Sequence, residues 1–148
     1  QMHQKICLLF SLLEFEEYGD KYMSHMVHCS NYLGQKLRDY GFDIADWHGQ
    51  ISSTHQIFIR CSKEEMDLIY DNAYKCEVTL NKKHKDLFLR YGIRLGTQEI
   101  ARYDWNDEAL DKCAYVVKEL ANPNINVEEI LGIVHSLPAK TVHYTLLL

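Results

Sequence analysis

The sequence predicts an α+β fold in which a small β-sheet is covered by helices. The first observation is the alternation in residues 56–60, where Ile57 and Ile59 point to one side of a strand and Phe58 points to the other. The second is the three- and four-residue spacing of apolar side chains in the segments around it, which is typical of amphipathic helices. The predicted order is helix, helix, strand, strand, helix, strand, strand, helix, helix, with no internal repeat.

Composition indicates one globular domain with a real core. The chain has 148 residues, of which 47% are hydrophobic and 25% are charged. The formal net charge of -5 argues against nucleic acid or an anionic membrane as a partner, because those surfaces attract clustered Lys and Arg. The apolar run at residues 6–10 is too short to span a membrane. The chain begins at Gln1, inside a predicted helix, so we expect a piece of a longer polypeptide; processing would give the same start.

The cysteines indicate neither a disulfide framework nor a zinc ribbon. There are 5 of them, an odd number, and no two form a CxxC pair. Reduced thiols in a cytoplasmic protein are the simplest account.

Residues 1–40 are predicted to be a helical segment that leads into the small α+β domain of residues 41–148. Residues 2–18 carry enough apolar side chains for a buried helix. Gly19 is expected to interrupt it, and Asp20 to cap a second helix over residues 21–40. Gly41 then acts as a stop. The stripe of that second helix is Tyr22, Met26, Cys29, Leu33 and Leu37.

The middle of the chain predicts the sheet. Residues 42–45, 56–60, 77–80 and 92–95 are read as strands, and residues 82–85, rich in lysine, as a solvated loop. Ser62 and Glu65 form a capping box at the start of a helix over residues 63–74. Its inner positions are Met66, Ile69, Tyr70 and Ala73.

The last part of the chain predicts two more helices. Asn106 caps residues 107–120, and acidic residues fill the first turn, where the helix dipole favours them. Asn126 caps residues 127–137, with Glu129 at the capping-box position. The apolar tail of residues 141–148 is expected to dock or to pair as a strand.

Arg94 is the first candidate binding residue. In an extended Gly-Ile-Arg-Leu-Gly segment, Ile93 and Leu95 point to one face and Arg94 points to the other, where Gly92 and Gly96 have no side chains to block access. A planar guanidinium there suits a carboxylate, which it can hold through two parallel hydrogen bonds. The alternative is a surface arginine that pairs with a nearby Asp or Glu.

Three stretches give the chain a family likeness. They are Thr-His-Gln at 54–56, Val-Thr-Leu-Asn-Lys at 78–82 and Gly-Ile-Arg-Leu-Gly-Thr at 92–97. Their order and spacing resemble those of glycine (serine) hydroxymethyltransferase, and the helix that ends in Tyr40-Gly41-Phe42 resembles the one that opens that enzyme's C-terminal region. The resemblance implies a pyridoxal-phosphate enzyme of the aspartate-aminotransferase fold type. This chain would then be its small C-terminal domain, with a mostly antiparallel sheet of three to four strands.

The resemblance also implies the partners and the site. Arg94 would hold the α-carboxylate of a small amino acid such as glycine, serine or threonine. Asn81 and His55 match family positions and are possible pocket residues. No catalytic residue is assigned, because the Schiff-base lysine and the phosphate cup belong to the family's large domain. We therefore expect no activity from this chain alone, and a homodimer in the complete protein.

Departures from the family argue against a folate site. Residues 83–91 are shorter than the corresponding family segment and contain no proline, and Gln98 stands where the family usually has proline. A folate-independent threonine aldolase or transaldolase fits these departures. A non-catalytic interaction or regulatory module derived from the same fold is the other alternative.

Two further groups of residues need an interpretation. His25, His28 and Cys29 share one helix face and could supply two ligands to zinc, but a structural site needs four, so we expect packing and no metal. Tyr103 and Trp105 either line the pocket or pack against the next helix, and the second reading is favoured.

Overall fold

The sheet has four strands in the described part of the chain. The computed structural model describes residues 2–84 and 91–146. The strands are β1 (Asp43–Ile44), β2 (Gln56–Arg60), β3 (Asn81–Lys83) and β4 (Gly92–Gly96), in the order β1-β2-β4-β3. Each neighbouring pair is antiparallel. The predicted fold class, a small antiparallel sheet covered by helices, is confirmed.

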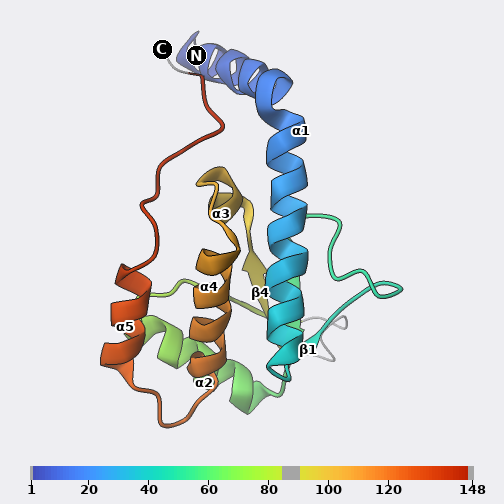
Figure 1. The fold of residues 1–148 in the computed structure, drawn as a ribbon. Coiled ribbons are helices and arrows are strands. Elements are labelled where there is room, and N and C mark those ends of the chain that lie inside the picture. Colours follow the sequence, from blue (N-terminus) through green and yellow to red (C-terminus); the bar gives the residue numbers. More distant parts are fainter. Residues whose placement is uncertain (1, 85–90, 147–148) are drawn as a thin grey trace.

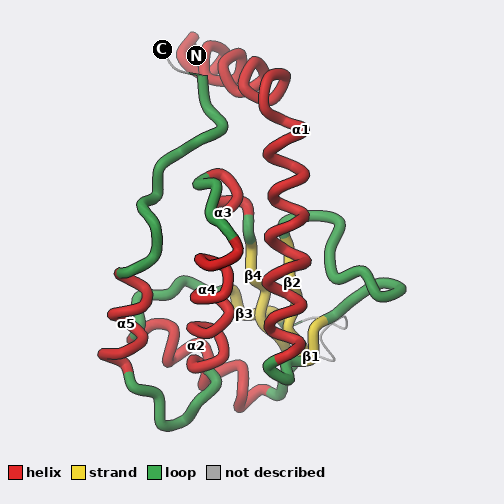
Figure 2. The backbone as a smooth tube through the Cα atoms, viewed as in Figure 1, coloured by secondary structure: helices red, strands yellow, loops and turns green. Residues whose placement is uncertain are grey.

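Five helices accompany this sheet among the described residues, and the large ones cover one face of it (Figure 2). They are α1 (Met2–Asp39), α2 (Lys63–Lys75), α3 (Gln98–Arg102), α4 (Asp107–Leu120) and α5 (Val127–His135). The inward residues of β2 and β4 pack against α1, α2 and α4 to form the main core. Its largest fully buried aliphatic side chains are Leu37, Ile57, Ile59, Ile69, Ile93, Leu120 and Ile130. None of the described helices has the length and apolar character needed to cross a membrane.

α1 differs from the prediction in two ways. The expected interruption at Gly19 is wrong, because one helix runs through Gly19 and Asp20 to Asp39. The ring of Phe15 lies where a side chain on Gly19 would point, at 3.3 Å from the ideal Cβ position. A single helical glycine costs only about 1 kcal/mol, so it need not end a helix. Figure 1 shows that the axis of α1 instead bends sharply within its first half.

The second difference concerns burial of residues 2–18. The sequence predicts a buried helix there, yet most of its large apolar side chains are exposed. They are Met2, Ile6, Leu8, Leu9, Phe10, Leu12, Leu13 and Phe15. The second half of α1 behaves as predicted, because Met26, Cys29, Leu33 and Leu37 are buried.

The end of α1 is fixed as expected by a left-handed glycine. Gly41 has φ of 92°, a conformation that favours glycine. The Phe42 amide donates to the Leu37 carbonyl at 3.1 Å, and the Gly41 amide donates to Arg38 at 2.9 Å. This pair of bonds is a Schellman motif.

The predicted strand at residues 77–80 is wrong, because β3 instead begins at Asn81. Glu77 has φ of 58°, and the amide of Val78 donates to the Ala73 carbonyl at 2.9 Å. These residues therefore complete the C-terminus of α2 and cannot pair in the sheet. Lys82 and Lys83 lie in β3 and not in a loop. Lys85 lies outside the described residues.

Most of the capped helices are confirmed. The Ser62–Glu65 capping box, the Asn106 cap of α4 and the Asn126 cap of α5 are all present. Tyr70, predicted to face inward, is 39% exposed, and its ring instead packs under the Lys82 ammonium at 4.3 Å. The short helix α3 was not predicted, and α5 ends at His135. The tail docks without forming a strand.

Candidate functional site

Arg94 lies at the centre of the sheet face that is opposite the helices. Ile93 and Leu95 are buried in the core, whereas Arg94 is half-buried. Its cross-strand neighbours are Phe58 on β2 and Asn81 on β3. Side chains directly opposite each other in an antiparallel pair share one face, so Asn81 and Arg94 are brought together.

The guanidinium of Arg94 has no protein partner among the residues that the structure describes. None of the carboxylates in residues 2–84 and 91–146 lies within 4.0 Å of it, and no hydrogen bond to it is present. The alternative of a surface arginine paired with Asp or Glu finds no support in this part of the chain. Arg60, on the same face of the neighbouring strand, is by contrast paired with Asp43 at 3.3 Å. An unpaired guanidinium of this kind is available to bind an anion.

Gly96 serves a different purpose from the open access expected. A Cβ at this position would lie 2.5 Å from the side-chain oxygen of Gln98. Gly96 is two residues from Arg94, so the direction of its missing side chain is that of the Arg94 side chain. Glycine therefore allows the carboxamide of Gln98 to lie against the strand on this side. This contact was not predicted.

His55 is placed by its backbone. Its backbone carbonyl accepts a hydrogen bond from the backbone amide of Thr97 at 2.9 Å. Its ring Nε2 lies 3.3 Å from the side-chain Nε2 of Gln56. His55 therefore joins the start of β2 to the end of β4, and its ring lies beside the side chain of Gln56, which is on the same sheet face as Arg94.

A cavity of about 770 Å³ lies beside β4 and includes all three candidates in its lining. Its walls come from α1, the start of β2, residues 77–81, the end of β4, α3, α4, α5 and the start of the tail. Trp105, which is 6% exposed, also lines it, contrary to the favoured reading, whereas Tyr103 does not. The volume is within the range of small-molecule sites, and the lining mixes apolar with polar and charged side chains.

Thr97 is the residue that sequence reasoning missed. It is fully buried, and its hydroxyl lies 3.2 Å from the Met26 carbonyl and 3.3 Å from the His55 carbonyl. Its own carbonyl accepts from Ala101 as α3 begins. Thr97 thus ties α1 and β2 to the end of the strand that carries Arg94. Its place as the last residue of the Gly-Ile-Arg-Leu-Gly-Thr block was the available signal.

Replacing Thr97 with valine should lower the free energy of unfolding by about 1–3 kcal/mol, because the Met26 carbonyl loses a buried hydrogen-bond donor while the volume is kept. Urea unfolding would measure the change. Thr79→Val, at an exposed position, is the matched control and should stay within about 0.5 kcal/mol. Equal values for the two variants would contradict this role of Thr97.

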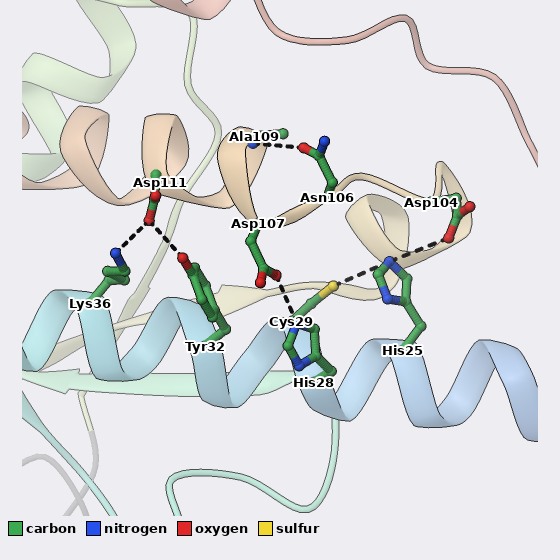
Figure 3. Close-up of polar contacts among 10 residues, drawn as sticks. All are labelled: His25, His28, Cys29, Tyr32, Lys36, Asp104, Asn106, Asp107, Ala109 and Asp111. Carbon is green, nitrogen blue, oxygen red and sulfur yellow. Dashed lines mark hydrogen bonds and ion pairs between the residues drawn. The ribbon is translucent and has the colours of Figure 1, made fainter.

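The residues considered as metal ligands instead help to hold α1 against α4 and the turn before it (Figure 3). His28 lies 2.8 Å from Asp107, and His25 lies 3.7 Å from Asp104 and 3.6 Å from the Cys29 sulfur. Burial raises the pKa of Cys29 to about 11. Within the described ranges, no group of three or more His, Cys, Asp or Glu has the arrangement of a metal site.

Further along the contact between α1 and α4 there is an ion pair. Asp111 of α4 contacts Lys36 at 2.8 Å and accepts a hydrogen bond from Tyr32 at 3.1 Å. The hydrogen bond from Lys36 is the main reason that the pKa of Asp111 is lowered. These contacts fix the two helices that cover β4.

The described residues do not fit pyridoxal phosphate by themselves. Covalent attachment of this cofactor needs a lysine held in a pocket. Every lysine in the described ranges is exposed or half-exposed, and Lys140 of the tail is the one among them that lines the cavity. Among the described residues, the cavity therefore contains no complete site for this cofactor.

Comparisons with known proteins confirm the resemblance. No family model matches the chain. Serine hydroxymethyltransferase of Methanocaldococcus jannaschii is 26% identical over 97% of this chain, which corresponds to 37% of that protein. The same enzyme of Methanobrevibacter smithii is 29% identical over 86% of this chain and 32% of its own length. The chain thus matches the C-terminal part of these relatives and spans about a third of their length.

A solved structure confirms the fold. L-threonine transaldolase from Pseudomonas fluorescens, in its internal aldimine state, superposes with a TM-score of 0.77 over 92% of this chain and 32% of that one, at 17% identity.

Proposed function

We propose that this chain is the C-terminal domain of a pyridoxal-phosphate-dependent enzyme, similar to hydroxymethyltransferases, that acts on a small amino acid. In this proposal residues 1–148 form one domain, with residues 1–40 as its N-terminal helical segment. The observation that carries the proposal is the unpaired Arg94 at the centre of β4, in a chain similar to serine hydroxymethyltransferases.

The proposed role of Arg94 is to bind and orient the substrate. Its guanidinium can hold an α-carboxylate at two points, which fixes the rotation of the amino acid about its long axis. Asn81 lies directly across the strand pair and can donate or accept one further hydrogen bond. The cofactor supplies the electron sink for the reaction when it is bound.

The partner of this chain is proposed to be a large domain that holds pyridoxal phosphate. Two surfaces support this. The face of the sheet that carries Arg94 and Asn81 has no described helix over it, and the first half of α1 exposes eight large apolar side chains. An exposed apolar surface of this extent marks an interaction site. A homodimeric assembly and a cytoplasmic location are part of the same proposal.

A folate-independent aldolase or transaldolase is the second candidate reaction. The short connection from Asn81 and Lys82 to β4 favours it, because a folate site would draw on that segment; residues 85–90 lie outside the described residues. In a third case the chain is a non-catalytic module, and then neither the cofactor nor an amino acid binds to the complete protein.

The proposal predicts a clear difference between the chain alone and the complete protein. Pyridoxal phosphate added to residues 1–148 should give at most weak binding and no borohydride-trapped adduct on a single lysine, because the described lysines are solvent-accessible. The complete protein should give one such adduct, and glycine should change its absorbance. A stable adduct on the chain alone would contradict the proposal that a separate large domain binds the cofactor. No adduct on the complete protein would favour the non-catalytic module.

A further inference from the structure

The C-terminal tail runs from the end of α5 back to the first half of α1, across the open side of the molecule (Figure 1). Residues 137–140 line the same cavity as Arg94 and Asn81. The other walls of that cavity come largely from helices and strands, which are held by backbone hydrogen bonds. The tail is the part of the wall with the least local structure.

Glu14 holds the far end of the tail. Its Oε1 accepts a hydrogen bond from the Thr145 hydroxyl and another from the Leu146 amide at 3.2 Å. Arg102 of α3 lies 3.7 Å from the other carboxylate oxygen. The hydrogen bond from Thr145 is the main reason that the pKa of Glu14 lies below its ordinary value. Glu14 is therefore a charged acceptor at neutral pH.

Tyr144 makes a second set of contacts at the same end. Its hydroxyl donates to Asp104 at 3.0 Å, and its ring lies 5.7 Å from that of Tyr22 and 6.4 Å from that of Tyr18. The amide of His143 donates to the Arg102 carbonyl at 3.0 Å. The contacts of the tail with α1 and α3 are thus concentrated in residues 143–146.

The middle of the tail has little to hold it. Residues 139–143 are exposed, and the backbone bond at 2.9 Å from Thr141 to Ala139 is internal to the segment. A segment that bounds a cavity but is fixed mainly at its ends can swing away when the distal contacts are broken.

We propose that residues 137–146, the C-terminal strap, are a removable wall of the Arg94 cavity and that Glu14 is the latch that keeps it closed. The proposal rests on the proposed function only in assigning a ligand to that cavity. Release of the strap opens the cavity from the side of α5, and docking encloses the apolar walls. The strap thereby regulates access to the part of the cavity that α4 and α5 line, and not to the open sheet face on which the Arg94 side chain lies.

Alkylation of cysteine measures this opening without any substrate. Cys113 lines the cavity, whereas Cys61 does not. Burial raises the pKa of each thiol to about 11, so the two have similar thiolate fractions and Cys61 is an internal control. N-ethylmaleimide is added to the folded protein, and the rate at each cysteine is followed by peptide mass spectrometry.

Glu14→Ala is expected to increase the alkylation rate of Cys113 about tenfold and to leave Cys61 unchanged, because hydrogen bonds to a charged acceptor are lost. Amide exchange at His143 and Leu146 should speed up in parallel. Glu17→Ala is the matched control, since Glu17 is an exposed acid on the same helix with no hydrogen bond or ion pair among the described residues. Glu14→Gln, which keeps an acceptor oxygen, should fall between the two.

Equal alkylation rates of Cys113 in Glu14→Ala and Glu17→Ala would overturn the proposal that the strap closes the cavity. If Glu14→Ala also accelerated Cys61, the helix itself would have been loosened, and Thr145→Val would decide, because it removes only a tail hydroxyl. A rise at Cys113 alone in Thr145→Val supports the latch, and no rise at Cys113 rejects it. Cysteine alkylation does not depend on ligand binding. If Arg94 proved not to bind a carboxylate, the result for the strap would therefore still hold.

Discussion

Arg94→Ala in the complete protein is expected to weaken binding of the amino-acid substrate about 100-fold, the size of effect seen when one partner of a hydrogen-bonded charge pair is removed. The reason is that the Arg94 guanidinium has no protein partner among the described residues, whereas Arg60 on the same face is paired with Asp43. The effect should appear in KM and kcat together, because the same contact also orients the substrate. Steady-state kinetics, with direct binding of glycine, would measure it.

Two variants make this test specific. Arg94→Lys keeps the charge but loses the two-point grip, so it should recover only part of the affinity. Arg60→Ala removes an arginine from the same side of the neighbouring strand, where it is already paired with Asp43, and should leave binding unchanged. Unchanged kinetics in Arg94→Ala would mean that Arg94 is a surface arginine with no role in substrate binding.

Ile93→Ala is expected to lower the free energy of unfolding by about 2–5 kcal/mol, the usual cost of truncating a fully buried isoleucine. Ile93 is 0% exposed and packs between the sheet and the helices. Urea unfolding followed by circular dichroism would measure the loss. Tyr74→Ala, at a side chain that is 85% exposed, should change stability by no more than about 0.5 kcal/mol. A loss below 1 kcal/mol for Ile93→Ala would mean that the core around β4 is looser than its burial indicates.

The parts of the fold that the sequence predicted well depend on local rules. The caps at Ser62, Asn106 and Asn126 and the alternation around Ile57 and Ile59 are encoded within a few residues, and each is confirmed. The errors came from tertiary effects. Val78 has the composition of a strand residue, but its amide completes the end of α2. Gly19 reads as a break, yet the helix continues through it.

The candidate site was predicted only in part, for a similar reason. The alternation around Arg94 is local, so its face could be read from the sequence. The position of Asn81 opposite Arg94 could not, because it depends on the register between two strands that the chain order alone does not define. The contributions of Thr97, Trp105 and the tail depend on long-range contacts that leave no periodic signal. The same holds for the first half of α1, whose apolar composition predicts burial but does not identify the covering surface.

The strand order β1-β2-β4-β3 has a consequence for how the protein folds. β4 is the last strand in the sequence, but it lies between β2 and β3, which do not pair with each other. The pairing of Arg60 with Gly92 encloses residues 61–91, so the sheet requires closure of a long loop before its central hydrogen bonds form. An incomplete chain that ends before residue 92 therefore has only the short β1–β2 pair. We expect Arg94 to act as a binding group only late in folding, when the strand that carries it completes the sheet.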